Sequence, residues 1–363
     1  MFSFDLTEEQ RMMVGAVRRY AQEHLRKHFQ SADERGEIPD GLLQTGWELG
    51  LTASNIPESC GGFGRHSALD GALYAEELGW GDLSAALALM APNLVAIPVL
   101  ECGTEAQRKN LLPCFTSDRF LPATAALIEP SVGFDPQALE THATRVDGGY
   151  LLTGRKVFVP LAREAQAILV YASEAGATQA FLVEPGAKGL SVSGREKNMG
   201  IKALPTYELS LEEVKVGRDS KLGGAEGVGF GRLANFSRVA LAALALGVAR
   251  GAYEYALDYA RNRQAFGEPI AARQAIAFLL AEMAMDIDAV RLMVWEAAWK
   301  LDRAEQATRQ AYLAKEFADQ MALKVTDGAV QILGGHGYIR DYPVELWLRN
   351  GRGFAHFDGL AMV

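Results

Sequence analysis

The chain has 363 residues, 49% of them hydrophobic, which is enough for a large core and for roughly two to three domains of about 150 residues. Its 36 basic and 45 acidic side chains give a formal charge of -9. A protein with this balance lacks the basic surface that nucleic-acid binding needs, so DNA and RNA are excluded as expected partners.

The three cysteines, Cys60, Cys102 and Cys114, are far apart and form no C-x-x-C pair. This spacing argues against a zinc site and a disulfide framework, and it favours a reducing, cytoplasmic location. The longest weakly polar run, VALAALALGVARGAYEYAL, is interrupted by Arg250 and Glu254 before it reaches membrane-spanning length. No membrane segment is therefore expected.

Helical patterns fill the first third of the chain. Apolar residues recur three and four positions apart from Thr7 to about Phe29, and Thr7 with Gln10 forms a capping box at the start of this stretch. More helix is predicted over GLLQTGWELGL, over residues 68–102 and over residues 104–112. These patterns predict an all-helical domain over residues 1–118.

Short apolar runs with turn signals follow. In TYELSLEEVKV the residues Tyr207, Leu209 and Leu211 alternate with polar neighbours, which is the period of a half-buried strand. A compact antiparallel β domain is predicted over residues 119–226.

Long helical patterns return after GGAEGVGFG, over about 233–262, 270–303 and 305–333. Their apolar stripes and short breaks predict a helical bundle over residues 227–363. The predicted fold class is therefore α+β, mostly α, with a helical domain, a middle β domain and a C-terminal helical bundle.

Two segments of the bundle do not suit a purely structural interpretation. RNRQAFGEPI breaks a helix directly after Arg263, and QILGGHGYIRDYPVELWLRN ends an apolar helix with Gly334 and Gly335 and then adds Gly337. A helix stop explains one glycine, whereas the close approach of a ligand to the backbone explains all three.

Two other patterns have ordinary explanations. GGAEGVGFGR lacks the G-K-[ST] ending of a phosphate-binding loop and is interpreted as a linker. His24 and His28 stand four apart in EHLRKHF without a third ligand, so no metal site is expected. The role of Asp358, the acid in WLRNGRGFAHFDGLAMV, remains open at this point, because the stretch alone fits both a catalytic base and a turn residue.

Taken together and in order, these segments resemble the flavin-dependent acyl-CoA dehydrogenases. IPESCGGFG is similar to the family's Pro-Glu...Gly-Gly-x-Gly loop, and ALIEPSVGFD is similar to its Thr-Glu-Pro-x-x-Gly-Ser-Asp signature. RNRQAFGEPIAARQAIAFLLAEM resembles the Arg-x-x-Phe-Gly...Gln segment, and QILGGHGYIRDYPVELWLRN resembles the second signature. The resemblance implies an N-terminal helical domain, a middle β domain and a C-terminal four-helix bundle, usually assembled as a tetramer.

The family reaction removes the α-proton of an acyl-CoA thioester with a carboxylate, while the β-hydrogen leaves as hydride to flavin N5. It needs a carboxylate in line, donors to the thioester carbonyl and a dry pocket. The resemblance thus implies FAD as cofactor, an acyl-CoA substrate, a role in fatty acid metabolism and an electron-transfer flavoprotein as electron acceptor.

Carried over residue by residue, the resemblance implies that Asp358 is the base. The positions expected to contact the flavin are Leu127, Ile128, Phe158, Val159 and Pro160. The positions expected to hold the adenosine and diphosphate across a subunit interface are Arg263, Phe266, Gln274, Gln331, Gly334 and Gly335. Substrate contacts are expected from Asn235, Ser237 and Arg238.

The chain departs from the family at several of these positions. Ile128 replaces a threonine, Phe158 a tryptophan, and Pro160 a threonine whose hydroxyl meets flavin N5; proline also lacks the N–H. Leu360 replaces a threonine that meets the phosphates. Asp358 replaces a glutamate, which withdraws the carboxylate by about 1.5 Å if the backbone is unchanged.

Three hypotheses follow. The first is a FAD-dependent acyl-CoA dehydrogenase, a homotetramer or dimer with Asp358 as base. The second is a non-catalytic or half-site subunit that pairs with a complete homologue in a hetero-oligomer, motivated by Ile128, Pro160 and Leu360. The third is a flavin oxidase of the nitroalkane-oxidase type, in which the shorter aspartate suits a smaller acidic carbon.

Overall fold

The computed structural model describes residues 5–363, and the first residues of the predicted N-terminal domain, 1–4, lie outside this range. The helices of the first part are α1 (Glu8–Tyr20), a π-helical turn (Ala21–Leu25), α2 (Arg26–Arg35), α3 (Leu42–Trp47), α4 (Ala68–Gly81), α5 (Leu83–Met90), α6 (Asn93–Cys102) and α7 (Glu105–Leu111). The capping box of Thr7 and Gln10 is confirmed.

A mixed sheet follows the helices. Its strands are β1 (Ala123–Ala126), β2 (His142–Val146), β3 (Gly149–Pro160), β4 (Ala167–Glu174), β5 (Ala177–Val183), β6 (Leu190–Arg195) and β7 (Thr206–Gly217). The order is β1-β4-β2-β3-β7-β6, with β5 paired to β4. As the alternation predicted, Tyr207, Leu209 and Leu211 face the core.

The prediction of an antiparallel sheet needs one correction, because β4 runs parallel to both β1 and β2. Ala123 lies opposite Ala167, so the chain crosses over the sheet between these partners. The period of two is the same in both kinds of ladder, so the alternation in sequence carries no information about direction.

The last part forms a bundle of long helices. They are α8 (Phe230–Asn262), α9 (Gln274–Asp302) and α10 (Thr308–Leu333), followed by the short α11 (Gly335–Tyr338) and α12 (Val344–Gly353). A small hairpin of β8 (Gln264–Ala265) and β9 (Glu268–Pro269) joins α8 to α9. The predicted fold class, with its order of helices, sheet and bundle, is confirmed.

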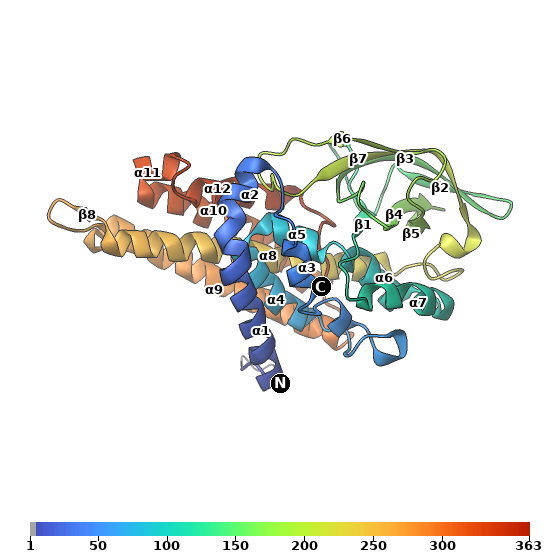
Figure 1. Ribbon diagram of the computed structural model, residues 1–363, viewed down its shortest axis with the longest axis horizontal. Helices are drawn as coiled ribbons and strands as arrows, with labels where there is room; N and C mark the ends of the chain where they lie inside the picture. The colour runs from blue at the N-terminus through green and yellow to red at the C-terminus, as the bar shows by residue number, and fades with distance from the viewer. Residues whose placement is uncertain (1–4) are drawn as a thin grey trace.

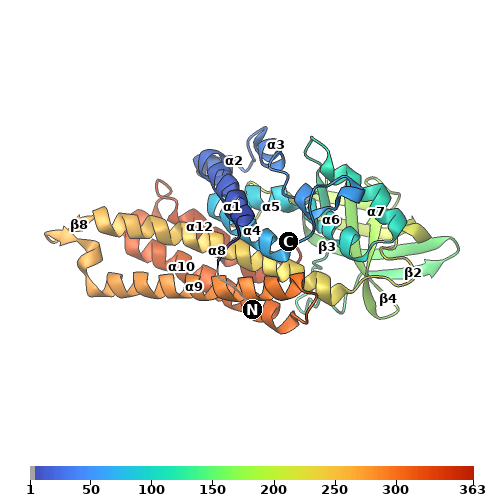
Figure 2. The same cartoon turned by 90° about the horizontal axis from the view of Figure 1, so that it is seen from below.

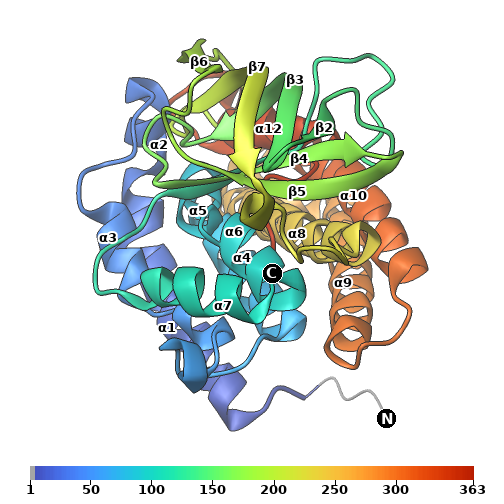
Figure 3. The same cartoon turned by 90° about the vertical axis from the view of Figure 1, so that its right-hand side faces the viewer.

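The bundle is elongated and the sheet lies at one of its ends (Figures 1 and 2). Helix α8 begins beside the sheet and ends at the β8–β9 hairpin, at the opposite end of the molecule (Figure 2). Seen end-on from the side of the sheet, the sheet lies across that end of the bundle and over the N-terminal helices (Figure 3). A ligand between sheet and bundle is therefore far from the hairpin of the same chain.

The two most apolar helical segments are core elements. Leu83–Cys102 and Phe230–Asn262 are long and apolar enough to cross a membrane by composition, but 94% and 83% of their most apolar windows are buried inside the fold. Small residues bring α4 and α8 into backbone contact, because a Cβ added to Gly79 would lie 2.6 Å from the carbonyl oxygen of Leu244.

Candidate active site

Asp358 lies in a tight turn between α12 and the C-terminal residues. The N–H of Leu360 donates to the carbonyl oxygen of Phe357 at 3.2 Å, which closes the turn around Asp358 and Gly359. Gly359 has a φ of +73°, and an added Cβ would lie 2.6 Å from Cδ2 of Leu127. Both facts require glycine at this position, so the backbone beside Asp358 is tightly specified.

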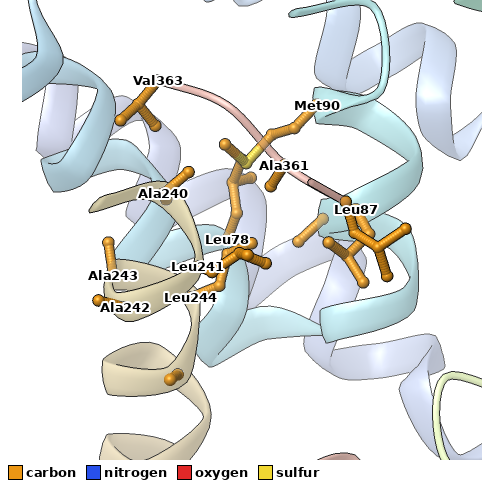
Figure 4. Packing of buried hydrophobic residues seen from close by; sticks show 14 of the residues in the cluster. Leu78, Leu87, Met90, Ala240, Leu241, Ala242, Ala243, Leu244, Ala361 and Val363 are labelled. Carbon is orange, nitrogen blue, oxygen red and sulfur yellow. The ribbon is translucent and has the colours of Figure 1, made fainter. Parts of the chain in front are cut away.

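The residues after this turn are anchored in the core. Leu360, Ala361, Met362 and Val363 are all buried, and Asn93 Nδ2 donates to the carbonyl oxygen of Met362 at 3.2 Å. In Figure 4, Ala361 and Val363 lie between the helices that carry Leu87, Met90 and Ala240. Asp358 therefore belongs to a fixed turn and not to a fraying tail.

A cavity of about 840 Å³ opens between the sheet and the bundle at this turn. It brings together Ile128 from the loop after β1, Phe158 from β3 and Asp358. Phe134 and Phe357 add apolar wall. The lining is mixed, because Arg352 and His356 also border the cavity. Its aromatic and aliphatic part is what a proton-abstracting carboxylate needs, since apolar walls keep water away from the reacting carbon.

Strand β3 has an irregularity at the cavity. Its register with β7 shifts between Lys156 and Val159, and Phe158 has a φ of +55°. The N–H of Phe158 donates to Oε1 of Glu196 at 3.2 Å. The other oxygen, Oε2 of Glu196, is buried and has no hydrogen-bond partner within residues 5–363. A strained residue held by a carboxylate at a cavity wall is typical of a functional position.

A buried ion pair fixes the loop that carries Ile128. Lys156 Nζ lies 2.7 Å from Oε1 of Glu129 and 3.1 Å from the carbonyl oxygen of Leu127. Glu129 also accepts the N–H groups of Glu140 and Thr141. Burial alone would raise the pKa of Glu129, but Lys156 and Thr141 outweigh it and hold that pKa below its ordinary value.

A second hollow, a groove of about 660 Å³, lies where α8 and α10 meet the loop after β1. Arg238 and Gln137 line it together with Tyr312 and Leu313. The Arg238 guanidinium carbon lies 5.6 Å from the Tyr312 ring centre, and its Nη1 donates to Asn235 Oδ1 at 3.2 Å. Because the same loop also lines the first cavity through Phe134, the two hollows border one segment.

A third hollow, of about 490 Å³, lies between α1, α4, α8 and α9, but its charges satisfy one another. Arg250 pairs with both Glu76 and Glu77, and Arg18 and Arg291 complete the chain of ion pairs. This pairing indicates a structural cluster.

Comparison with known proteins identifies the family. Its models match the chain in three consecutive pieces: the acyl-CoA dehydrogenase N-terminal domain over residues 7–119, the middle domain over 124–214 and the C-terminal domain over 230–361. This chain belongs to the acyl-CoA dehydrogenase family. The predicted family and enzyme class are thereby confirmed: the protein is a flavoprotein-type oxidoreductase of the class that acts on CH–CH groups.

Relatives match over nearly the whole chain. The probable acyl-CoA dehydrogenase YngJ of Bacillus subtilis is 34% identical over 96% of this chain and 94% of its own length. The caffeyl-CoA reductase–Etf complex subunit CarC of Acetobacterium woodii is 33% identical over 98% and 96%. The butyryl-CoA dehydrogenase structure from Megasphaera elsdenii has a TM-score of 0.90 at 31% identity, covering 98% of this chain and 96% of that one.

The family positions predicted to contact flavin divide into two groups. Ile128 and Phe158 line the large cavity. Leu127 lies behind it, against Gly359, while Val159 and Pro160 are buried at the end of β3, with Val159 in the core of the β domain.

The predicted substrate residues lie in the groove region. Arg238 lines the groove, and Asn235 is buried with its Nδ2 donating to Thr308 Oγ1 at 3.1 Å. Ser237 is buried, and its Oγ has no hydrogen-bond partner among the residues described. The three residues are therefore adjacent to one another but separate from the cavity that holds Asp358.

The predicted adenosine and diphosphate positions lie at the other end of the bundle. They flank the β8–β9 hairpin and α11, opposite the sheet (Figure 1). All are exposed: Arg263, Phe266, Gln274, Gln331, Gly334 and Gly335. Phe266 is 95% exposed, and a Cβ added to Gly334 or Gly335 would meet nothing within 4 Å. One chain alone does not bring them to the cavity.

Two residues of the site were missed by sequence reasoning. Glu196 reaches Phe158 from the segment after β6. Asp319 on α10 pairs with Lys315, whose Nζ donates to the carbonyl oxygen of Phe354, just before the Asp358 turn. Each is a single acid in an ordinary polar context, so its role depends on contacts across many residues of sequence.

Proposed function

We propose that this protein is a FAD-dependent acyl-CoA dehydrogenase that desaturates an acyl-CoA thioester between its α and β carbons, with Asp358 as the base. The observation that supports it most is the fixed turn that aims Asp358 at a cavity shared with Ile128 and Phe158. The carboxylate would accept the α-proton, and the aromatic walls would keep water away from the carbon being deprotonated.

The residues present fit FAD as two halves. The cavity offers apolar walls for the ring system and a buried acceptor, Glu196 Oε2, that lacks a donor among the described residues. The exposed Arg263 and the open backbone at Gly334 and Gly335 suit a diphosphate. When bound, FAD would take up the hydride from the β-carbon.

These halves lie at opposite ends of one chain, which supports assembly with a second copy. Helix α9 exposes Phe278, Met285 and Leu292, which are 61%, 68% and 45% exposed and seven residues apart. A stripe at this spacing forms a continuous apolar seam on one helix face. We propose that a second copy covers this seam in a homodimer or homotetramer and supplies the other half of the cofactor site.

The substrate proposal is an acyl-CoA thioester that enters by the groove. Arg238 offers a cation to the negatively charged CoA part, and Asn235 and Ser237 lie on the same helical turn. The acyl part would extend towards Asp358. A role in fatty acid metabolism and a cytoplasmic location are part of this proposal.

The electron acceptor we propose is an electron-transfer flavoprotein. The support is the relative CarC, which is named as a subunit of a complex with Etf. The acceptor would receive electrons after product forms, so turnover without it should stop at one equivalent of reduced flavin.

A half-site subunit is the second candidate, and two residues favour it. Pro160 offers neither hydroxyl nor N–H, and Leu360, which is buried, packs in the core instead of facing a ligand. In this case the chain would bind only one half of the cofactor and pair with a complete homologue.

The test is the visible spectrum of the purified protein, followed during anaerobic addition of straight-chain, branched and aromatic acyl-CoA thioesters. We expect a flavin band that one thioester bleaches, and loss of bleaching in Asp358→Asn with the flavin retained. Asp147→Asn, at an exposed turn between β2 and β3, is the matched control and should behave as the wild type.

Full bleaching in Asp358→Asn would refute the base assignment. A colourless protein would favour the half-site subunit, and peroxide formed from nitroalkanes would favour a nitroalkane-type oxidase.

A further inference from the structure

A single buried carboxylate joins helix α2 to helix α12. Asp33, in α2, is 4% exposed, and its two oxygens accept hydrogen bonds from the two Nη atoms of Arg349 at 2.9 and 2.7 Å. Lys202 Nζ and Arg340 Nη2 each lie 3.2 Å from Oδ2 of Asp33. Burial would raise the pKa of Asp33, but Arg349 and Lys202 outweigh it and hold that pKa below its ordinary value. The carboxylate is therefore charged at neutral pH.

Arg349 also contacts the segment that follows β6. Its Nη1 donates to the carbonyl oxygen of Met199 at 3.0 Å. Next to it, Oδ1 of Asn350 accepts the N–H of Ile201 at 2.7 Å. A Cβ added to Gly200 would lie 2.5 Å from the carbonyl oxygen of Arg349, so the segment lies directly against α12. Three consecutive residues of this segment are thus fixed to one turn of α12.

This contact joins two walls of the large cavity. On one side, the segment leads back to Glu196, which holds the N–H of Phe158. On the other side, α12 continues through the short turn of residues 354–356 into Asp358. The segment itself also lines the cavity. The spacing between the Phe158 wall and the Asp358 wall therefore depends on the contact that Asp33 supports.

We propose that Asp33 is a positioning residue for the cofactor cavity, which orients Arg349 and through it sets the spacing between the flavin wall and the base. The inference rests on the proposed function, because it assumes that the cavity binds the flavin ring of FAD beside Asp358. A bidentate pair suits this role, since two parallel hydrogen bonds fix the orientation of a guanidinium as well as its position. Asp33 lies behind Arg349 and does not itself line the cavity, so it acts on the cofactor through these contacts.

The first variant, Asp33→Asn, keeps the shape of the side chain and removes its charge. One oxygen can still accept from Arg349, but the new amide nitrogen faces only donors, so the bidentate pair is lost. When the FAD-loaded protein is diluted and released flavin is followed by fluorescence, we expect the dissociation constant of FAD to rise about tenfold.

The kinetics of the same variant show which part of the site has moved. Anaerobic flavin reduction at saturating thioester should slow on the order of a hundredfold if the walls shift by about 1 Å. The thioester concentration that gives half of the maximal rate should change by less than about twofold. The groove at Arg238 shares no residue with the contact between α12 and the segment after β6, so thioester binding there stays intact.

Gly200→Ala tests the same contact without changing a charge. The added methyl group would push the segment away from the Arg349 carbonyl oxygen, and we expect FAD affinity and reduction rate to fall as in Asp33→Asn. This variant decides the question if Asp33→Asn does not fold. Asp40→Asn, exposed in the connection between α2 and α3, is the control and should behave as the wild type.

A merely structural Asp33 would lower the melting temperature but leave the FAD affinity and reduction rate of the folded protein unchanged. That result in Asp33→Asn, or in Gly200→Ala where Asp33→Asn does not fold, would overturn the proposal. A weaker response to thioester with unchanged FAD affinity would overturn it as well, because the groove and not the cavity would then depend on Asp33.

The proposed function and the role of Asp33 can fail separately. If Asp33→Asn binds FAD more weakly but no thioester reduces the flavin of the wild type, the proposed function fails while the role of Asp33 at the cavity stands. If a thioester reduces the wild type and Asp33→Asn equally, the function stands and the role of Asp33 fails. A wild type that binds no added FAD would refute both.

Discussion

Gly359 shows how one residue can set the geometry of the base. Its φ of +73° lies in the left-handed region, and the position of a Cβ would be 2.6 Å from Leu127 Cδ2. For Gly359→Ala we expect the turn to shift and carry Asp358 with it. A displacement of about 1 Å costs on the order of a hundredfold in rate, which stopped-flow flavin reduction would measure.

The control for this change is Gly194→Ala, since an added Cβ at Gly194 meets nothing within 4 Å. That variant should reduce its flavin at the wild-type rate. Equal rates in both alanine variants would show that the turn tolerates the extra methyl group and that the placement of Asp358 is less strictly set than its geometry indicates.

At the scale of single residues, the sequence predicted what local rules determine. Thr7 and Gln10 were assigned correctly because a capping box needs only four consecutive residues. Asp358 was selected by resemblance, but whether it lay in a fixed turn depended on Leu127 and Asn93, which are more than 200 residues away in sequence. Glu196 and Asp319 gave no local signal at all.

Among the elements, β3 and the loop after β1 depend on the buried pair of Lys156 and Glu129. Lys156 is 0% exposed and Glu129 is 4% exposed. Lys156→Met would leave the Glu129 carboxylate buried and unpaired, which costs about 3–5 kcal/mol of unfolding free energy. Chemical denaturation at pH 7 would measure it. Arg155→Met is the matched control, since the exposed Arg155–Glu208 pair contributes about 0–1 kcal/mol.

The same pair predicts a pH dependence of stability. The folded-state pKa of Glu129 lies below its ordinary 4.5, so its contribution is present above that value and is lost as pH falls through the folded-state pKa. We expect wild-type stability to decline below about pH 4.5 more steeply than that of the double variant Lys156→Met/Glu129→Gln. Parallel melting curves of the two proteins between pH 3 and 6 would contradict this assignment.

At the scale of elements, the sequence predicted most of the helices and strands but not the direction in which the strands pair. Helix α8 was expected from about residue 233 and begins at Phe230. It could be predicted because an apolar stripe of this length has few other interpretations. The parallel pairing of β1 with β4 and the π-helical turn at Ala21–Leu25 were not predicted. Both depend on tertiary packing, and the periodicity of the sequence is unchanged by either.

At the scale of the whole molecule, the apolar seam on α9 and the divided cofactor site point to the same assembly. Met285, 68% exposed, lies at the centre of the seam. We expect Met285→Glu to weaken association, since a charge at the centre of an apolar interface must lose its hydration. Sedimentation should then show smaller particles that bind less flavin.

Glu296→Lys, exposed on the same helix, is the control for a change of charge alone. A monomeric wild type that binds a full equivalent of FAD would rule out a shared site.

Complementation between two damaged chains tests the shared site directly. A chain with Asp358→Asn lacks the base but keeps the predicted adenosine and diphosphate positions at the far end of the bundle. A chain with Arg263→Ala and Gln331→Ala keeps the base and lacks part of those positions. If each cofactor site combines the cavity of one copy with the far end of another, a mixed dimer has one intact site and one doubly damaged site. Random mixing makes half of the dimers mixed, so co-expression should restore about a quarter of wild-type flavin reduction from two nearly inactive parents. A site contained in one chain would give no recovery, because neither parent could repair the other.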